Sequence, residues 1–228
     1  MTIPLEELRT SLLFGNLADE ELLAVGEVVS AREYPARALV FTQGERLDGL
    51  WFVRRGRVRL YRVSPTGREF TLCIARRDHL PCMGMCPLFD GNLAPAHAQA
   101  LEPTTIYFIE RTRAYQLAAE SRGIADLLAR VLANHTRYLT QLSAGLALRC
   151  SLPRLNELLL GYAEERGRAG PRGIELQLDL TREMLASVLG TTPQMVTQMF
   201  QRLEQAGLVD ARGKHIVILD KERLAKMV

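Results

Sequence analysis

The sequence predicts an α+β fold in which an N-terminal antiparallel β-roll of the cupin-like kind is followed by a long helix and a C-terminal winged helix-turn-helix. Three patterns support this prediction. Short β-rich runs between glycine turns occupy residues 34–110, an apolar stripe with helical spacing runs over 124–142, and two short helices joined by a tight glycine turn fit 180–206. The predicted borders place the roll and its N-terminal helices in 1–111, the long helix in 112–150 and the winged helix in 151–228.

The composition is typical of a folded protein without membrane spans. The chain has 228 residues, of which 47% are hydrophobic, enough for one large core or two modest ones. No apolar run approaches the roughly 18–20 residues that a bilayer crossing needs, and residues 1–13 lack the basic start and long apolar stretch of a secretory signal. The four cysteines show no C-x-x-C pairing. We therefore expect a cytoplasmic protein with reduced cysteines.

The N-terminal half combines short helices with strands. Leucines and valines at three- to four-residue spacing over 5–29 predict amphipathic helices interrupted at 14–16. Short runs of β-branched and aromatic residues then predict a compact antiparallel roll. The predicted strands are 39–41, 50–53, 58–63 and 105–109, and the turns lie at Gly44, Gly56 and Gly67.

A long helix is predicted after Arg111, because no proline follows until Pro153. An apolar stripe along it, with alternating spacings of four and three residues, indicates a coiled-coil seam against a second copy of the chain. The alternative is that the stripe packs only on the chain's own roll. The predicted dimer-interface residues are Ile124, Leu128, Val131, His135, Tyr138 and Leu142.

The C-terminal third begins with a predicted helix over 153–164 and a polar turn or linker over 166–173. A helix-turn-helix follows. Gly190 ends its first helix, because glycine tolerates a positive φ, and Thr192 and Pro193 start the second as N-cap and first helical residue. Inward-facing positions are predicted at Leu185, Ala186 and Leu189 of the first helix and at Val196, Met199 and Leu203 of the second.

A wing is predicted after the second helix, which Gly207 closes. Residues 208–209 and 216–218 are predicted to form paired strands, with the turn between them at 213–215. Two helices joined by a tight turn and followed by such a hairpin make a winged helix, whose second helix can enter a major groove.

The outward side chains of the second helix suit a DNA groove. Glutamine can form bidentate hydrogen bonds with adenine, so these side chains are candidate base readers, whereas nearby cations are candidate phosphate contacts. The local charge does not by itself indicate nucleic acid, because 151–228 holds 11 Lys and Arg against 10 Asp and Glu. The alternative is an ordinary solvated surface. The predicted DNA-contacting residues are Arg182, Thr192, Gln194, Thr197, Gln198, Gln201, Arg202, Lys214 and His215.

Several segments together resemble the CRP/FNR family of bacterial transcription regulators over nearly the whole chain. LTREMLASVLGTTPQMVTQMFQRLEQAGLVDARGKHIVI resembles the family's helix-turn-helix and wing, LLFGNLADEEL its opening helix, and GERLDGLWFVRRGRVRLYRVSPTGREFTL its cyclic-nucleotide-binding-like β-roll. AQALEPTTIYFIER resembles the last strands before the dimer helix. The resemblance implies a homodimer on a two-fold symmetric operator in double-stranded DNA, a small effector bound in the roll, and contact with RNA polymerase.

The sequence departs from the family at two effector sites. Members that bind cyclic AMP carry a glycine-glutamate motif and an arginine-serine pair, where this chain has Met85 after Gly84 and then Ala94-Pro95. A buried phosphate without a cation is costly, so we predict that cyclic AMP is not the effector. The oxygen-sensing branch holds an iron–sulfur cluster with three N-terminal cysteines and a fourth in the roll. No cysteine precedes Cys73 and Tyr107 stands at the fourth position, which argues against that cluster.

The recognition helix departs as well. Many members carry glutamate and arginine where this chain has Gln194 and Gln198. We therefore expect an operator that differs from the usual half-site of the family.

Soft metal ligands are concentrated in one segment of the roll, where His79, Cys82, Met83, Met85 and Cys86 fall within eight residues. Such ligands suit haem iron, copper(I) or another soft metal, and a thiolate among them could act as a redox switch. The family's haem-containing carbon monoxide sensors place an iron-ligating cysteine here, and Cys82 lies at the matching distance after Glu69. Their histidine is replaced by Gly84, which leaves His79 or His97 as substitutes.

The alternative for all four cysteines is a structural role, because most free cysteines are small buried apolar residues. On that hypothesis Cys82 and Cys86 merely fill the roll. The same applies to Cys73 and Cys150, for which the structural role is the prediction.

Two other functional classes are weighed against DNA binding. An enzyme is not indicated, because the sequence contains no Ser-His-Asp arrangement, phosphate-binding glycine loop or His-Glu metal motif. A regulatory module of a kinase or channel system would share the roll but would lack the helix-turn-helix and wing. The C-terminal third therefore favours a DNA-binding regulator.

Overall fold

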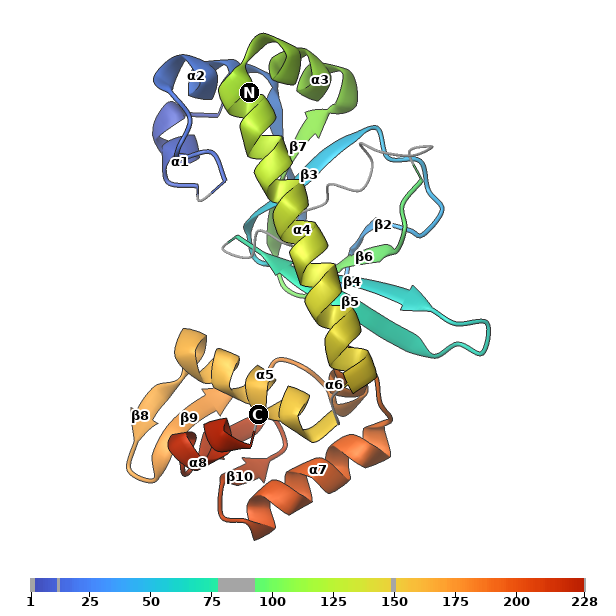
Figure 1. The fold of residues 1–228 in the computed structure, drawn as a ribbon, viewed down its shortest axis with the longest axis vertical. Coiled ribbons are helices and arrows are strands. Elements are labelled where there is room, and N and C mark those ends of the chain that lie inside the picture. The colour runs from blue at the N-terminus through green and yellow to red at the C-terminus, as the bar shows by residue number, and fades with distance from the viewer. Residues whose placement is uncertain (1–2, 12, 78–92, 149–150, 228) are drawn as a thin grey trace. The chain divides into compact units, whose positions relative to one another are not determined.

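A computed structural model describes residues 3–11, 13–77, 93–148 and 151–227 (Figure 1). The chain divides into two compact units, residues 1–68 with 72–141 and residues 142–228 with 69–71. The boundary between residues 141 and 142 falls inside a helix and coincides with neither predicted domain border, so the borders at 111 and 150 stay predictions. None of the described helices is both long and apolar enough to cross a membrane.

The N-terminal helices lie on either side of the predicted interruption. They are α1 (Leu5–Arg9) and α2 (Asp19–Val28). Leu8, Leu22 and Val25 are buried at the helical spacing seen in the sequence, and Phe14 from the connecting segment joins the same core. The helices therefore cover one face of the roll with their apolar sides.

The roll consists of two antiparallel sheets with the strand orders β1-β7-β3 and β2-β6-β4-β5. All four predicted strands are confirmed. Three further strands were not predicted: one alternates alanine with polar residues, one is rich in charged residues, and one follows the Gly67 turn. The strands are β1 (Val29–Tyr34), β2 (Leu39–Phe41), β3 (Gly49–Arg55), β4 (Arg57–Val63), β5 (Glu69–Arg76), β6 (His97–Ala100) and β7 (Thr104–Glu110).

The two faces of the β1-β7-β3 sheet belong to different cores. Trp51 pairs with Phe108 across β3 and β7, and both side chains belong to the interior of the roll. Leu50 and Ile109, one residue away on each strand, pack instead against the N-terminal helices. The alternation follows from the two-residue repeat of a strand, which sends successive side chains to opposite faces.

Tyr107 links α1 to this sheet. Its hydroxyl donates a hydrogen bond to the Glu7 carboxylate and accepts one of 3.1 Å from Arg54 Nε, which also lies 3.0 Å from Glu7 Oε1. Burial raises the pKa of the Tyr107 hydroxyl to about 12, and the hydrogen bond from Tyr107 lowers the pKa of Glu7. The neutral tyrosine and the charged carboxylate are therefore the forms that the folded chain favours.

The free energy of unfolding is expected to fall as the pH rises from 10 to about 12. Tyr107 ionises near its ordinary pKa of 10.0 in the unfolded chain and near 12 in the folded chain. A raised folded pKa contributes stability that is complete below the unfolded value and is lost as the pH climbs through the folded one, here about 2–3 kcal/mol. Urea unfolding measures this loss. Tyr107→Phe should flatten the profile, and an unchanged slope in that variant would contradict the assignment.

The single helix predicted within 112–150 is wrong, because the structure has two helices there, α3 (Arg111–Glu120) and α4 (Arg122–Leu148). They meet at Ser121, whose backbone is extended, with φ −127° and ψ 121°. The Ser121 hydroxyl accepts a hydrogen bond of 3.1 Å from Ile124 N and so caps α4, and it donates to the Glu21 carboxylate of α2. A serine cap thus separates the helices without a proline.

Part of the predicted seam of α4 packs inside its own unit. Ile124 and Val131 are buried in the core that the N-terminal helices share. The Tyr138 hydroxyl donates a hydrogen bond of 2.7 Å to the Leu72 carbonyl, and its ring packs partly on the roll interior. For these three residues the intramolecular alternative describes the contacts that the structure shows.

The remaining seam residues lie on a second stripe that stays partly or fully exposed. Leu128 and Leu132 pack partly against the same core as Ile124 and Val131, His135 and Leu142 are half-buried, and Leu139 and Leu146 are 40% and 39% exposed. With half-buried Leu132, this stripe reads 128, 132, 135, 139, 142 and 146, again with alternating spacings of four and three. We call these six residues the outer stripe of α4.

The second unit combines helices with one four-stranded sheet of order β10-β11-β9-β8. Of the two alternatives predicted for 166–173, a polar turn or a linker, the linker is wrong, because Arg168 pairs with Glu175 and Gly170 with Gly173 in a short hairpin whose turn lies within the segment. The segment is rich in glycine, which is depleted in strands, so its sequence did not indicate the three-residue edge strand. The elements are α5 (Ser151–Arg166), β8 (Arg168–Gly170), β9 (Gly173–Gln177), α6 (Arg182–Leu189), α7 (Pro193–Gln205), β10 (Val209–Arg212), β11 (His215–Ile218) and α8 (Lys221–Lys226).

Candidate nucleic-acid interface and roll pocket

The turn between α6 and α7 has the predicted chemistry. Gly190 ends α6 in the left-handed region at φ 61° and ψ 35°. Thr192 caps α7 by accepting a hydrogen bond of 3.2 Å from Met195 N, and Pro193 occupies the first turn. The predicted inward residues of both helices are buried. The two helices therefore form the predicted helix-turn-helix.

The candidate base readers form one exposed surface on α7. Gln194, Gln198 and Gln201 are exposed on the side opposite the buried Leu203. Thr197 is also exposed, but its hydroxyl donates a hydrogen bond of 3.1 Å to the Pro193 carbonyl. The glutamine amides carry the donors and acceptors that base edges require, whereas the threonine hydroxyl is partly committed to its own helix.

Arg182, a candidate phosphate contact, is half-buried between α6 and α7. Its guanidinium carbon lies 3.9 Å from the centroid of the Phe200 ring, and burial lowers its pKa. One guanidinium nitrogen is buried without a hydrogen-bond partner among the described residues. Arg182 thus packs α6 against α7, and its contact with phosphate stays a prediction.

Three other predicted phosphate contacts lie at the surface of the same unit. Arg202 of α7 is exposed, as are Lys214 in the turn of the wing and His215 at the start of β11. His215 Nε2 lies 3.8 Å from Glu175 Oε2. These side chains follow the glutamines in sequence, on the same helix and on the wing, where they can contact the DNA phosphates beside the recognition helix.

The wing itself confirms the predicted strand pair and adds a residue that sequence reasoning missed. Val209 pairs with Ile218 and Arg212 with His215, and Glu204 of α7 accepts a hydrogen bond of 3.0 Å from Ala211 N. Arg212, which was not predicted, is exposed at the wing turn and its Nε lies 3.3 Å from Asp210 Oδ1. Its place in an Arg-Gly-Lys-His run was the signal that could have found it.

Most of the predicted effector ligands lie outside the described residues. They are His79, Cys82, Met83, Met85 and Cys86. His97, on β6, is described. Its Nδ1 accepts a hydrogen bond of 3.3 Å from Gln43 N, and its ring stacks on Tyr61 with centroids 5.1 Å apart. Within the described ranges, no group of three or more His, Cys, Asp or Glu side chains could hold a metal ion.

Ala94 and Pro95 stand where cyclic-AMP-binding members carry arginine and serine. Ala94 is buried, and its backbone is bonded on both sides: its N–H donates to the Glu45 carbonyl at 2.8 Å and its carbonyl accepts from Gly44 N at 2.9 Å. The loop is therefore held by backbone bonds, and neither of these two side chains offers a charge to a phosphate.

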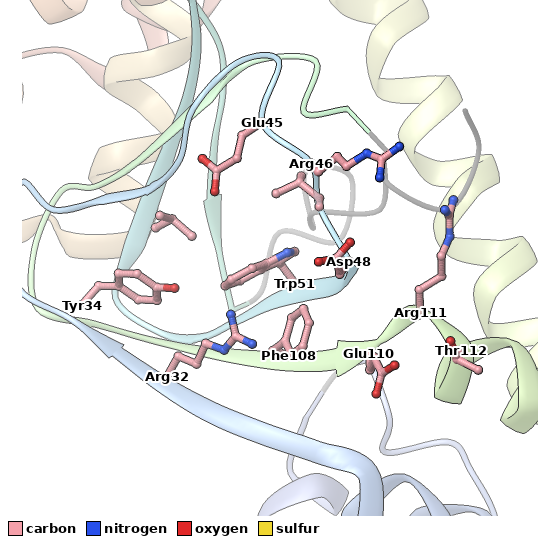
Figure 2. A pocket seen from close by; sticks show the side chains of 12 residues that line it. Arg32, Tyr34, Glu45, Arg46, Asp48, Trp51, Phe108, Glu110, Arg111 and Thr112 are labelled. Carbon is pink, nitrogen blue, oxygen red and sulfur yellow. The ribbon is translucent and has the colours of Figure 1, made fainter. Parts of the chain in front are cut away.

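The roll has an open pocket of about 730 Å³ that sequence reasoning did not identify (Figure 2). It lies at one end of the β1-β7-β3 sheet, beside the loop that follows β2 and the start of α3. Tyr34, Trp51 and Phe108 supply aromatic side chains. The charged lining residues are Arg32, Arg46 and Arg111, with Glu45, Asp48 and Glu110.

Comparison with known families matches both units. Residues 31–121 match the cyclic nucleotide-binding domain, and residues 153–227 match the Crp-like helix-turn-helix domain. The chain is 25% identical over 214 residues to the CRP-like cAMP-activated global transcriptional regulator of Mycobacterium tuberculosis (strain CDC 1551 / Oshkosh), a match that covers 94% of this chain and 95% of that protein. It is 26% identical over 211 residues to the transcriptional activator protein Anr of Pseudomonas protegens, covering 91% and 84%.

A solved structure has the same fold over most of the chain. The c-di-GMP-responsive global regulator CLP of Xanthomonas campestris superposes with a TM-score of 0.76 at 21% identity, and the match covers 89% of this chain and all of that one. The roll, the long helix and the winged helix-turn-helix therefore occur here in the order that this fold requires. The two domain matches, in this order and on these described elements, show that the chain belongs to the CRP/FNR family of DNA-binding transcription regulators.

Proposed function

We propose that the protein reads a specific, two-fold symmetric DNA site as a homodimer and switches its binding in response to an effector other than cyclic AMP. The observation that supports sequence-specific reading is the exposed glutamine surface of α7, next in sequence to a wing with exposed cations. Amide groups at this surface can distinguish base pairs in the major groove, and the cations contribute affinity through phosphates. The protein then works where the chromosome is, in the cytoplasm, and meets RNA polymerase there.

The outer stripe of α4 supports the dimer. Five leucines and His135 make up this stripe at alternating spacings of four and three, and Leu139 and Leu146 are left exposed in the single chain. A second copy covers it by symmetry, because the same residues then face one another across a two-fold axis. Such a dimer presents two copies of α7 to the two halves of one site.

Selection from a random pool of DNA duplexes is expected to enrich a two-fold symmetric site. Two recognition helices of a dimer read half-sites about one helical turn, roughly 34–36 Å, apart. Sequencing of the bound fraction after repeated rounds measures this directly. Enrichment of no sequence would contradict sequence-specific reading, and enrichment of a single asymmetric half-site would contradict the dimer.

The effector is proposed to act through Cys82, with Cys86 as its nearest partner. The support is the density of soft ligands over 79–86, which suits haem, a soft metal or a redox-active thiol. A bond to sulfur that forms in one state of the dimer and not in the other supplies the difference in affinity that a switch requires.

Replacement of Cys82 with serine is expected to remove the response of DNA binding to the effector while leaving basal binding. Operator affinity is measured under reducing, oxidising, haem-loaded and copper-loaded conditions, beside the parent chain and Cys73→Ser as the matched control. Cys73 is buried in the interior of the roll, so its replacement tests for general loss of stability. A variant that responds to every condition as the parent does would show that Cys82 is structural.

A further inference from the structure

We propose that the pocket at the end of the β1-β7-β3 sheet is a second ligand site of the roll and that it takes a small planar ring bearing one carboxylate. Twelve described residues of the first unit line the pocket (Figure 2). Its ligand is inferred from three features of the lining: clustered aromatic rings, a buried hydrogen-bond donor, and two arginines that form no ion pair with a described carboxylate.

The first feature is a cluster of planar groups, in which the rings of Trp51 and Phe108 are tilted by 57° and the Arg32 guanidinium lies over both. Trp51 and Phe108 have ring centroids 4.9 Å apart, and the Arg32 guanidinium carbon lies 3.8 Å from the Phe108 centroid and 4.7 Å from that of Trp51. Figure 2 shows the Arg32 guanidinium between the rings of Tyr34 and Phe108, below Trp51. Aromatic and guanidinium faces attract a further planar ring more strongly than they attract a saturated one.

The second feature is a buried donor without an acceptor. Trp51 is 8% exposed, and its Nε1 has no hydrogen-bond partner among the described residues. An indole nitrogen can only donate, and leaving it unpaired in the interior costs free energy. Figure 2 shows the nitrogen-bearing edge of the ring turned toward Arg46 and Asp48, within the pocket. An oxygen acceptor on a ligand in this space would satisfy it.

The third feature is the balance of charge. Arg32 and Arg46 form no ion pair with a described carboxylate, although both line the pocket. The Glu45 carboxylate already accepts a hydrogen bond of 2.8 Å from Thr42 N. Two guanidinium groups are thus available to an anion, and a charge-assisted bond to a carboxylate is among the stronger polar contacts in proteins.

The acidic residues of the lining limit the charge of that anion. Asp48 and Glu110 also line the pocket, so a doubly charged phosphate would meet two carboxylates as well as the arginines. A ligand with a single carboxylate meets less repulsion.

The pocket wall is also held by the backbone of the roll, because Arg111 N at the start of α3 donates a hydrogen bond of 2.8 Å to the Asp48 carbonyl.

Trp51 is the sole tryptophan of the chain, so its fluorescence reports directly on this pocket. The full-length protein is titrated with benzoate, 4-hydroxybenzoate and nicotinate, with cyclohexanecarboxylate, benzamide and inorganic phosphate as controls. We expect a saturable change in Trp51 emission with the three ring carboxylates and binding at least about tenfold weaker for each control. Cyclohexanecarboxylate and phosphate lack the planar ring, and benzamide lacks the negative charge. Calorimetry confirms the affinities independently of fluorescence.

Arg46→Gln and Arg32→Gln should each weaken benzoate binding by at least about tenfold, the usual effect of losing a charge-assisted hydrogen bond. Arg46 is exposed, so Arg46→Gln tests the charge even if Arg32→Gln disturbs the packing of the aromatic rings. Arg62→Gln, an exposed arginine on β4, is the matched control and should bind as the parent does.

Absence of saturable binding by any ring carboxylate would overturn the proposal, and so would equal affinity for benzamide, cyclohexanecarboxylate or phosphate. Unchanged benzoate affinity in both arginine variants would do the same. Selection of a DNA site is measured without these ligands, so failure here leaves the proposed DNA-binding function standing.

Discussion

Replacing Leu139 and Leu146 with lysine is expected to convert the dimer into folded monomers that no longer hold operator DNA. Both side chains are exposed in the single chain, at 40% and 39%, so lysine costs little there. In the dimer each leucine would be buried, at about 1.5–3 kcal/mol apiece, and the lysines would place like charges on the two-fold axis. The dimer dissociation constant should therefore rise at least about a thousandfold, as measured by sedimentation equilibrium.

Two matched substitutions separate this effect from general damage. Leu23→Lys places the same change on the exposed surface of α2, where Leu23 is 56% exposed, and should leave the dimer intact. Val131→Lys changes a residue that is 2% exposed in the chain's own core and should lower the thermal stability of the first unit. A full dimer in the Leu139 and Leu146 double variant would rule out the outer stripe as the interface.

Gln194→Ala and Gln198→Ala are each expected to relax the base preference at one position of the half-site. A bidentate amide contact to a base is worth about 1–3 kcal/mol of discrimination, and glutamine carries no charge, so affinity for non-specific DNA should hardly change. The measurement compares binding to the selected site and to its single-base variants at one salt concentration. Thermal unfolding should be unchanged, because both side chains are exposed.

Gln205→Ala provides the control, since Gln205 is an exposed glutamine at the last residue of the same helix. The N-terminal part of a recognition helix contacts the bases, so this variant should keep the parent's preference. If Gln194→Ala and Gln198→Ala instead weakened binding to all sequences equally, the two glutamines would be positioning contacts, and base reading would belong to other residues of α7.

The helix-turn-helix could be predicted from the sequence, because its turn depends on capping interactions between neighbouring residues. Gly190 ends α6 and Thr192 caps α7 as predicted, because a left-handed C-cap and a threonine N-cap depend on residues within one turn of the chain. The strand pair of the wing was predictable for the same reason. Short β-rich runs between glycine turns also predicted β2, β3, β4 and β7 of the roll, whereas β6, which alternates alanine with polar residues, gave no such signal.

Contacts between residues distant in sequence determined the features that the sequence did not predict. The Ser121 hydroxyl that caps α4 also bonds to Glu21, 100 residues away, and the packing of Arg182 on Phe200 depends on the angle between two helices. The pocket joins residues of β1, β3 and β7 with the start of α3, which no local pattern brings together.

The division of the α4 stripe shows the physical reason most clearly. The sequence by itself determined that α4 carries apolar residues at coiled-coil spacing, because spacing is a property of one helix. It could not determine which of them face the roll. Only the tertiary structure assigns Ile124 and Val131 to the chain's own core and leaves Leu139 and Leu146 exposed, since that assignment depends on how far the helix is rotated against the surface on which it packs.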